Sequence, residues 1–192
     1  MNLRTFFTFL SLFPAWVWGI EGTLQARVGY FGLTSSWPRE IYGCGAPDFE
    51  IEGGINLTPC AFYWSNLNYV WKQGHSTEFS DHTHLDLAVL STGFNLATPI
   101  LDSSTLLYLG LGISGACVHT SDHSAYLPAH TTRFGVGFVA KSGVSIPCTT
   151  HLFVNPFFDY YYQPIHAQSD GVHSRVDMGG FRVGLGFGYH FY

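Results

Sequence analysis

The sequence predicts an all-β protein, namely an eight-stranded antiparallel transmembrane β-barrel with the up-and-down order of a meander. Three observations support this fold class. Only 11% of the 192 residues are charged, whereas 17% are aromatic and 22 are glycine; soluble domains carry about 25% charged residues. Segments of about ten residues alternate between large apolar and small or polar side chains, which is typical of strands that cross a bilayer. Long polar connections alternate with short turns that contain proline.

Residues 1–19 have the pattern of a cleaved signal peptide. Arg4 supplies a positive charge before the apolar run TFFTFLSLFPAWVW, and small residues, Val17 and Gly19, precede Ile20 at the −3 and −1 positions. This run is shorter than the roughly 20 apolar residues that a spanning helix needs. We therefore expect an exported chain whose mature barrel covers residues 20–192.

The first four predicted strands each separate a large apolar face from a smaller or more polar one. The apolar faces carry Leu24, Ala26, Val28 and Tyr30 in 23–32; Phe49, Ile51, Ile55 and Leu57 in 48–57; and Tyr63, Leu67, Tyr69 and Trp71 in 61–72. The fourth strand begins as LDLAV, with Leu85, Leu87 and Val89 on its apolar face, and the alternation changes phase near Ser91–Gly93. Because one extra residue shifts the phase, we predict a β-bulge there.

The last four predicted strands place glycine and polar residues opposite large apolar side chains. The apolar faces carry Leu107, Leu109, Leu111 and Ile113 in 105–116; Phe134, Val136, Phe138 and Ala140 in 133–144; Leu152, Val154, Phe158, Tyr160 and Tyr162 in 151–162; and Phe181, Val183, Leu185, Phe187, Tyr189 and Phe191 in 178–192. We expect these faces to meet lipid and the opposite faces to line a lumen.

The connections between the predicted strands alternate in length. The long ones are Thr34–Pro47, Gln73–Thr83, His119–Thr132 and Pro164–Asp177, and the short ones lie around Pro59, Pro99 and Pro147. This alternation predicts four long outer loops and three short periplasmic turns, with both the N- and C-termini on the periplasmic side.

The charged residues on the polar faces distinguish this barrel from a soluble β-sandwich, which is the alternative fold. A sandwich exposes its polar face to water and crowds it with charge, whereas these faces are thin in charge and balanced in sign. Because an eight-stranded barrel is just wide enough for its own side chains, buried charges there must be paired. We predict a luminal ion network, with Glu50 and Glu52 as partners of the basic groups, drawn from Arg27, Glu50, Glu52, Lys72, Asp86, Arg133, Lys141, Asp159 and Arg182.

The end of the chain carries a family resemblance. Gly186-x-x-Tyr189-x-Phe191 resembles the C-terminal signal by which the barrel-assembly machinery recognises outer-membrane proteins, although one tyrosine, Tyr192, follows the usual final phenylalanine. The mature chain resembles the small eight-stranded outer-membrane barrels, the group that includes the OmpA transmembrane domain and the opacity-type adhesins. The resemblance implies residence in the bacterial outer membrane, with outer-membrane lipid as surroundings and the assembly machinery as a partner during insertion.

The four cysteines allow disulfide bonds in an exported protein. The predicted topology places Cys60 and Cys148 in periplasmic turns, and Cys44 and Cys117 near the outer rim. Bonds between opposite ends would have to span about 25 Å, so intramolecular pairing predicts Cys44–Cys117 and Cys60–Cys148. Free thiols and cross-links to other envelope proteins remain the alternatives.

Histidines gather in or beside the predicted long loops, at His75, His82, His84, His119, His123, His130, His166 and His173. Two local groups, Asp81-His82-x-His84 and His119-x3-His123, have ligands that suit zinc or copper, but neither is a complete motif. We therefore predict no metal site and no cofactor. The histidines then form a polar surface whose positive charge rises below about pH 6.5.

The predicted function is that of a non-enzymatic outer-membrane protein with a structural or surface-adhesion role, whose loops contact a host or envelope protein. Trp37, Tyr42 and Tyr126 are candidate anchors for that contact, or belt residues at the lipid interface. With 8 Lys and Arg residues and no basic run, nucleic acid is not an expected partner.

Two other functions remain open. His119-x-Ser121 resembles the His-x-Ser pair of the lipid A deacylase barrels, but the next strand lacks the acidic residue that completes their relay. A small pore is the other alternative, although eight strands leave no wide aqueous channel.

Overall fold

The computed structural model describes residues 21–75, 82–100, 104–122, 130–169 and 172–192. The predicted signal peptide lies outside these ranges, so its cleavage stays a prediction. No helix within the described ranges is long and apolar enough to cross a membrane. The elements are β1 (Gly22–Leu33), α2 (Ser36–Tyr42), β2 (Gly45–Thr58), β3 (Ala61–His75), β4 (His82–Pro99), β5 (Leu106–Asp122), β6 (His130–Pro147), β7 (Leu152–Tyr162), β8 (Pro164–Ser169), β9 (Val172–Asp177) and β10 (Gly180–Phe191).

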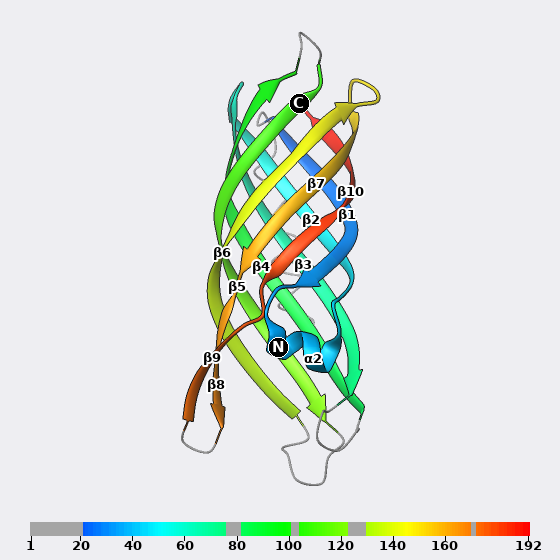
Figure 1. The fold of residues 1–192 in the computed structure, drawn as a ribbon. Coiled ribbons are helices and arrows are strands. Elements are labelled where there is room, and N and C mark those ends of the chain that lie inside the picture. Colours follow the sequence, from blue (N-terminus) through cyan, green and yellow to red (C-terminus); the bar gives the residue numbers. More distant parts are fainter. Residues whose placement is uncertain (1–20, 76–81, 101–103, 123–129, 170–171) are drawn as a thin grey trace, which may run out of the picture.

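Eight of these strands, β1 to β7 and β10, form a closed antiparallel barrel in meander order (Figure 1). The first and last barrel strands pair from Gly22↔Phe191 to Leu33↔Gly180, and β5 pairs with β6 to complete the ring. Closure pairs both edges of the sheet, which satisfies the backbone groups that an open sheet would leave exposed. The predicted eight-stranded antiparallel barrel is confirmed.

The barrel has two different ends. The β2–β3, β4–β5 and β6–β7 connections lie at one end, together with the start of β1 and the C-terminus, and we call this the short-turn end (Figure 1). Helix α2 and the β8–β9 hairpin lie at the opposite end, which we call the loop end.

Parts of the predicted long loops are regular structure. Helix α2 lies inside the predicted loop Thr34–Pro47, and β8 and β9 form a hairpin within Pro164–Asp177. Strands β5 and β6 also extend beyond the predicted bilayer segments, to Asp122 and from His130. Outside the bilayer a strand keeps its backbone hydrogen bonds but needs no apolar face, so its sequence need not alternate. The search for alternating segments therefore missed these extensions.

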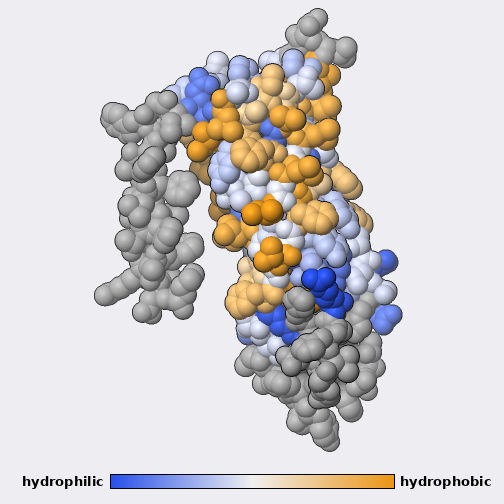
Figure 2. Space-filling view, turned by 90° about the vertical axis from the view of Figure 1, so that its left-hand side faces the viewer, coloured by the Kyte–Doolittle hydropathy of each residue, from blue (hydrophilic) through white to orange (hydrophobic). Residues whose placement is uncertain are grey.

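The distribution of exposed side chains is the inverse of a soluble protein. Val136, Phe134 and Leu111 are more than 70% exposed, whereas Arg27 and Arg182 are 0% exposed. Figure 2 shows hydrophobic residues over the middle and upper wall of the barrel, with strongly hydrophilic ones gathered towards the lower, loop end. The predicted outward faces of seven strands agree with this pattern.

Strand β4 is the exception, because both the predicted bulge and the predicted face are wrong. The register between β3 and β4 runs without interruption from Ala61↔Leu96 to His75↔His82, so Ser91–Gly93 contains no bulge. Leu85, Leu87 and Val89 are 1–3% exposed and point into the barrel. The apparent change of phase arises because the lumen itself is apolar in this region, so the large residues of β4 face inward here and outward only further along.

Glycines on the inner face receive aromatic rings from neighbouring strands. A Cβ at Gly188 would lie 2.1 Å from the Phe153 ring, and one at Gly184 would lie 2.9 Å from the Phe157 ring. Both are closer than side-chain atoms approach one another. The small inward residues of β10 therefore make room for rings that fill the narrow lumen.

Candidate functional site

The middle of the lumen is filled by a cluster of charged side chains, which we call the ionic layer. Its members come from five strands, β1, β2, β6, β7 and β10, and each is at most 5% exposed. The ionic layer consists of Arg27, Asp48, Glu50, Glu52, Lys141, Asp159 and Arg182. On each of these strands the large apolar residues occupy the outer face. The charged residues, which alternate with them, therefore point into the lumen.

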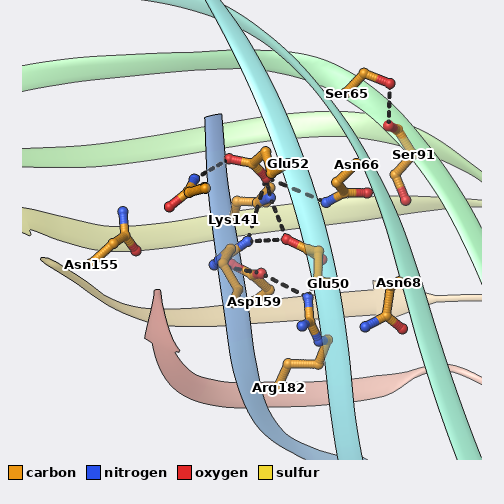
Figure 3. Close-up of polar contacts among 12 residues, drawn as sticks. Glu50, Glu52, Ser65, Asn66, Asn68, Ser91, Lys141, Asn155, Asp159 and Arg182 are labelled. Carbon is orange, nitrogen blue, oxygen red and sulfur yellow. Dashed lines mark hydrogen bonds and ion pairs between the residues drawn. The ribbon is translucent and has the colours of Figure 1, made fainter. Parts of the chain in front are cut away.

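Each charge of the ionic layer has at least one partner of opposite sign. Figure 3 shows how Glu50, Glu52, Lys141, Asp159 and Arg182 lie within the layer. Arg27 Nη1 lies 2.6 Å from Glu50 Oε1, and its Nη2 lies 3.0 Å from Asp159 Oδ2. Lys141 pairs with Glu52, and its Nζ lies 3.5 Å from Glu50 Oε1. Arg182 pairs with both Asp48 and Glu50. The ion pairs therefore cross-link strands on opposite sides of the barrel.

Neutral groups complete the layer. Gln25 Nε2 donates to Glu52 Oε1 at 2.6 Å, and Asn68 Nδ2 donates to Asp48 Oδ2 at 2.8 Å. Aromatic rings cover the cations: the Arg27 guanidinium carbon lies 3.6 Å from the Phe157 ring centroid. Such contacts hold buried charges in fixed positions, because moving any one of them would leave its partners unpaired in a medium of low dielectric constant.

Six of the nine predicted network residues lie in the ionic layer, and three lie elsewhere. Lys72 donates to the Gly45 carbonyl at 2.6 Å towards the loop end. Arg133 is half-buried on the inner side of β6, and it forms no ion pair with any described residue. Asp86 is on the outer face, where Tyr69 Oη donates to its Oδ1 at 2.7 Å, so its predicted luminal position is wrong. Its displacement follows from the reversed face of β4.

The sequence analysis left Asp48 out of the network. It is 4% exposed and pairs with Arg182. The signal was present, because Asp48 alternates in phase with Glu50 and Glu52 on the same strand.

An apolar cluster fills the lumen between the ionic layer and the loop end, and we call it the apolar plug. Tyr42 of α2 is 6% exposed within it, so its predicted role as a surface anchor or belt residue is wrong. Trp37 and Tyr126, the other two candidates, have no described side chains. The apolar plug consists of Phe31, Leu33, Tyr42, Val70, Leu85, Leu87, Val118, Ile165 and Met178.

A small cavity lies on the opposite side of the ionic layer. Its volume is about 70 Å³, and Glu52 contributes to its wall together with Gln25, Trp64, Asn95 and Tyr108. This is room for a few small molecules of the size of water. The ionic layer and the apolar plug lie between this cavity and the loop end.

The four cysteines are free thiols, so the predicted bonds Cys44–Cys117 and Cys60–Cys148 are absent. Cys117 lies opposite Ala88 and Phe134 on the outer face of β5. Cys44 precedes β2, which is separated from β5 by β3 and β4. The prediction placed both cysteines at one end of the barrel but did not fix their positions around its circumference.

The residues of the deacylase-like alternative lie on the outer face near the loop end. The register places Asp86 directly opposite His119, and His84 opposite Ser121. His119 Nδ1 lies 3.0 Å from Thr132 Oγ1. Among the described residues, no three His, Cys, Asp or Glu side chains gather as metal ligands; His123 lies outside the described ranges.

The three residues of the C-terminal pattern lie on β10, in register with β1. Tyr189 pairs with Leu24, and Phe191 pairs with Gly22. Tyr189 faces outward and stacks on His151 at a centroid distance of 5.4 Å, whereas Gly186 faces the lumen beside Arg27. Recognition by the assembly machinery stays a prediction.

Comparison with known proteins yields structural neighbours only. No family model matches the chain, and no curated protein matches its sequence. Solved structures that share its fold include the following three. OprG from Pseudomonas aeruginosa has a TM-score of 0.71 at 11% identity, over 90% of this chain and 96% of that one. The Neisserial surface protein NspA has a TM-score of 0.63 at 16% identity, over 88% and 97%. Ail of Yersinia pestis, in complex with a heparin analogue, has a TM-score of 0.57 at 12% identity, over 90% and 99%.

Proposed function

We propose that this chain, which has the fold of the small eight-stranded outer-membrane β-barrels, is a non-enzymatic protein of the bacterial outer membrane that displays its loop end to the outside. In this orientation the apolar outer face contacts lipid, and the short-turn end with the C-terminus faces the periplasm. The expected partner is a host or envelope protein that contacts the loops.

The filled lumen is the observation that supports this proposal. The ionic layer cross-links five strands, and the apolar plug closes the interior towards the loop end. A barrel of this kind is a rigid support rather than a conduit. The loop end carries α2 and the β8–β9 hairpin, in which Arg39 and Arg175 are exposed. A rigid base lowers the conformational entropy lost when such elements bind a partner.

The proposal is tested with the β8–β9 hairpin, which contacts the barrel through Gly135↔Ile165. Bacteria that display the chain should adhere to cultured host cells. Replacing residues 167–174 by a tight turn keeps Ile165 in place and should reduce adhesion. A Thr149→Ala change in the β6–β7 turn is the control, because that turn lies at the other end. Equal adhesion of the hairpin variant, the control and the wild type would contradict a display role for this hairpin.

The small-pore alternative is tested by conductance recordings in planar bilayers. A lumen filled by the ionic layer and the apolar plug should give no regular steps of porin size. Large, regular steps from the purified protein would refute the sealed interior.

A second candidate function is that of a lipid A-modifying barrel enzyme. The position of Asp86 opposite His119 favours this function. The sequence analysis found no acidic residue on β6 to orient the His119 imidazole, and Asp86 on β4 would supply that acidic group. Deacylase activity of the purified protein that is lost in both His119→Ala and Ser121→Ala would establish this function. Absence of activity in the wild type, folded as judged by heat-modifiable gel migration, would exclude it.

A further inference from the structure

The ionic layer carries one more negative charge than positive. Four carboxylates, those of Asp48, Glu50, Glu52 and Asp159, face three cations, and all seven residues are at most 5% exposed. A net charge removed from water is costly, and it is neutralised by a bound proton or by an ion. The ionic layer, taken by itself, therefore requires one further positive charge.

The cavity beside Glu52 contains polar atoms that lack partners. Gln25 and Asn95 are 7% and 8% exposed, both line the cavity, and the carbonyl oxygens of their side-chain amides accept no hydrogen bond. The indole N–H of Trp64, which lines the same cavity, is also unpartnered. Buried polar groups without partners are rare and point to a bound water or ion. The three side chains come from β1, β3 and β4, so strands on one side of the barrel contribute the unmatched polar groups of the cavity wall.

We infer that this cavity binds one sodium ion with a small number of waters. Oxygen atoms of Glu52, Gln25 and Asn95 are the available ligands, and oxygen ligands favour hard cations. A monovalent ion balances the single excess charge, whereas a divalent ion would leave a net positive charge. A volume of about 70 Å³ accommodates an ion and a water, and this water accepts the Trp64 N–H.

The ion enters from the short-turn end. The cavity wall extends from Glu52 to Ala97, Leu106 and Ser145, which lie where β4, β5 and β6 end or begin at that side. On the other side the Lys141 ammonium group pairs with Glu52 and repels a second cation. The site is thus a pocket that opens towards the short-turn end and not a segment of a pore. It does not depend on which partner the loops contact.

The indole N–H of Trp64 is a reporter for the site. The ¹⁵N-labelled protein in lipid nanodiscs is titrated with NaCl that replaces choline chloride at constant ionic strength and pH, and Trp64→Phe assigns the indole signal. The Trp64 signal should shift and saturate with sodium but not with choline. Asn95→Leu, which keeps the side-chain volume but removes an oxygen ligand, should weaken the apparent affinity about tenfold. Glu52→Gln should abolish the response because it removes the excess charge.

Ser114→Ala is the control, since Ser114 is a buried residue that donates to Gln163 Oε1 at 2.7 Å, outside both the cavity and the ionic layer. It should keep the wild-type sodium response. The inference is overturned if the Trp64 indole signal of the wild-type protein does not shift with sodium. If that signal shifts with pH alone, a proton and not sodium neutralises the layer, which would also overturn the inference. A sodium response that survives Glu52→Gln would equally overturn it. Should Glu52→Gln fail to fold, the wild-type and Asn95→Leu titrations still decide.

Discussion

Arg182, like Arg27, contacts three carboxylates of the ionic layer. Its guanidinium pairs with Asp48 and Glu50, and its Nη1 lies 3.4 Å from Asp159 Oδ2. Arg182→Met removes the charge but keeps much of the apolar stem, so these carboxylates lose a buried partner. We expect the free energy of unfolding to fall by about 3–5 kcal/mol, measured by urea denaturation in lipid vesicles.

Arg175→Met on β9 is the control for this change, because Arg175 is exposed at the loop end. Its effect should be about 0.5 kcal/mol or less, as for most surface substitutions. Equal effects of the two substitutions would mean that the ionic layer contributes nothing specific to the stability of the barrel.

Two glycines on the barrel wall should respond oppositely to a larger side chain. A Cβ at Gly184 would lie 2.1 Å from the Val28 carbonyl oxygen and 2.9 Å from the Phe157 ring, whereas a Cβ at Gly53 meets no atom within 4 Å. Gly184→Val should therefore destabilise the barrel by about 1–3 kcal/mol through overpacking. Gly53→Val should be neutral or slightly stabilising, because valine favours strands. The same urea titration measures both, and a stable Gly184→Val variant would contradict the packing described.

At the residue scale the sequence identified most of the ionic layer, because alternation assigns a side chain to a face wherever the other face is apolar. Glu50 and Arg182 were found in this way. Asp86 was misplaced because its neighbours, Leu85 and Leu87, are apolar and yet inward. Periodicity says which residues share a face, but it cannot say which face is inside when the lumen is apolar as well.

Among the elements, β4 gives the sharpest contrast between pattern and structure. Ala88 and Val89 are neighbours, and the structure directs Ala88 outward and Val89 inward, with Val89 3% exposed. In a background without the four native cysteines, Ala88→Cys should react with a nitroxide label that collides freely with oxygen in the lipid. Val89→Cys should stay unlabelled in the folded barrel and react only after denaturation. The reverse outcome would restore the face that the sequence favoured.

The elements at the loop end show where the sequence pattern stops being informative. Helix α2 has only seven residues and ends at Gly43, whose φ of 74° suits glycine. Such a short helix has no detectable hydrophobic period, although Tyr42 anchors it in the apolar plug. The β8–β9 hairpin was missed for a related reason, since its sequence shows no regular alternation of large apolar and polar residues.

At the scale of the whole molecule, the fold follows from two requirements that act on every strand. Lipid around the barrel demands apolar residues outside and a closed sheet, and a lumen of eight strands demands small or mutually paired residues inside. The low charge content, the alternation along the strands and the alternating loop lengths all follow from these two requirements. The architecture was therefore predictable from the sequence. The disulfide prediction considered only the end of the barrel at which each cysteine lies, although the meander order already separates Cys44 on the β2 side from Cys117 on β5 by two strands.

The orientation of the two faces is the central claim, and methyl NMR with a lipid-attached nitroxide tests it most directly. The protein carries labelled Ile, Leu and Val methyl groups in nanodiscs whose lipids bear the nitroxide near the acyl-chain end. Broadening should be strong for outward methyl groups and absent for inward ones, without any substitution. The account predicts broadened signals for Leu111, Ile113, Val136 and Val183, and sharp signals for Leu87, Val118 and Val139. Sharp signals from the first group together with broadened signals from the second would contradict it.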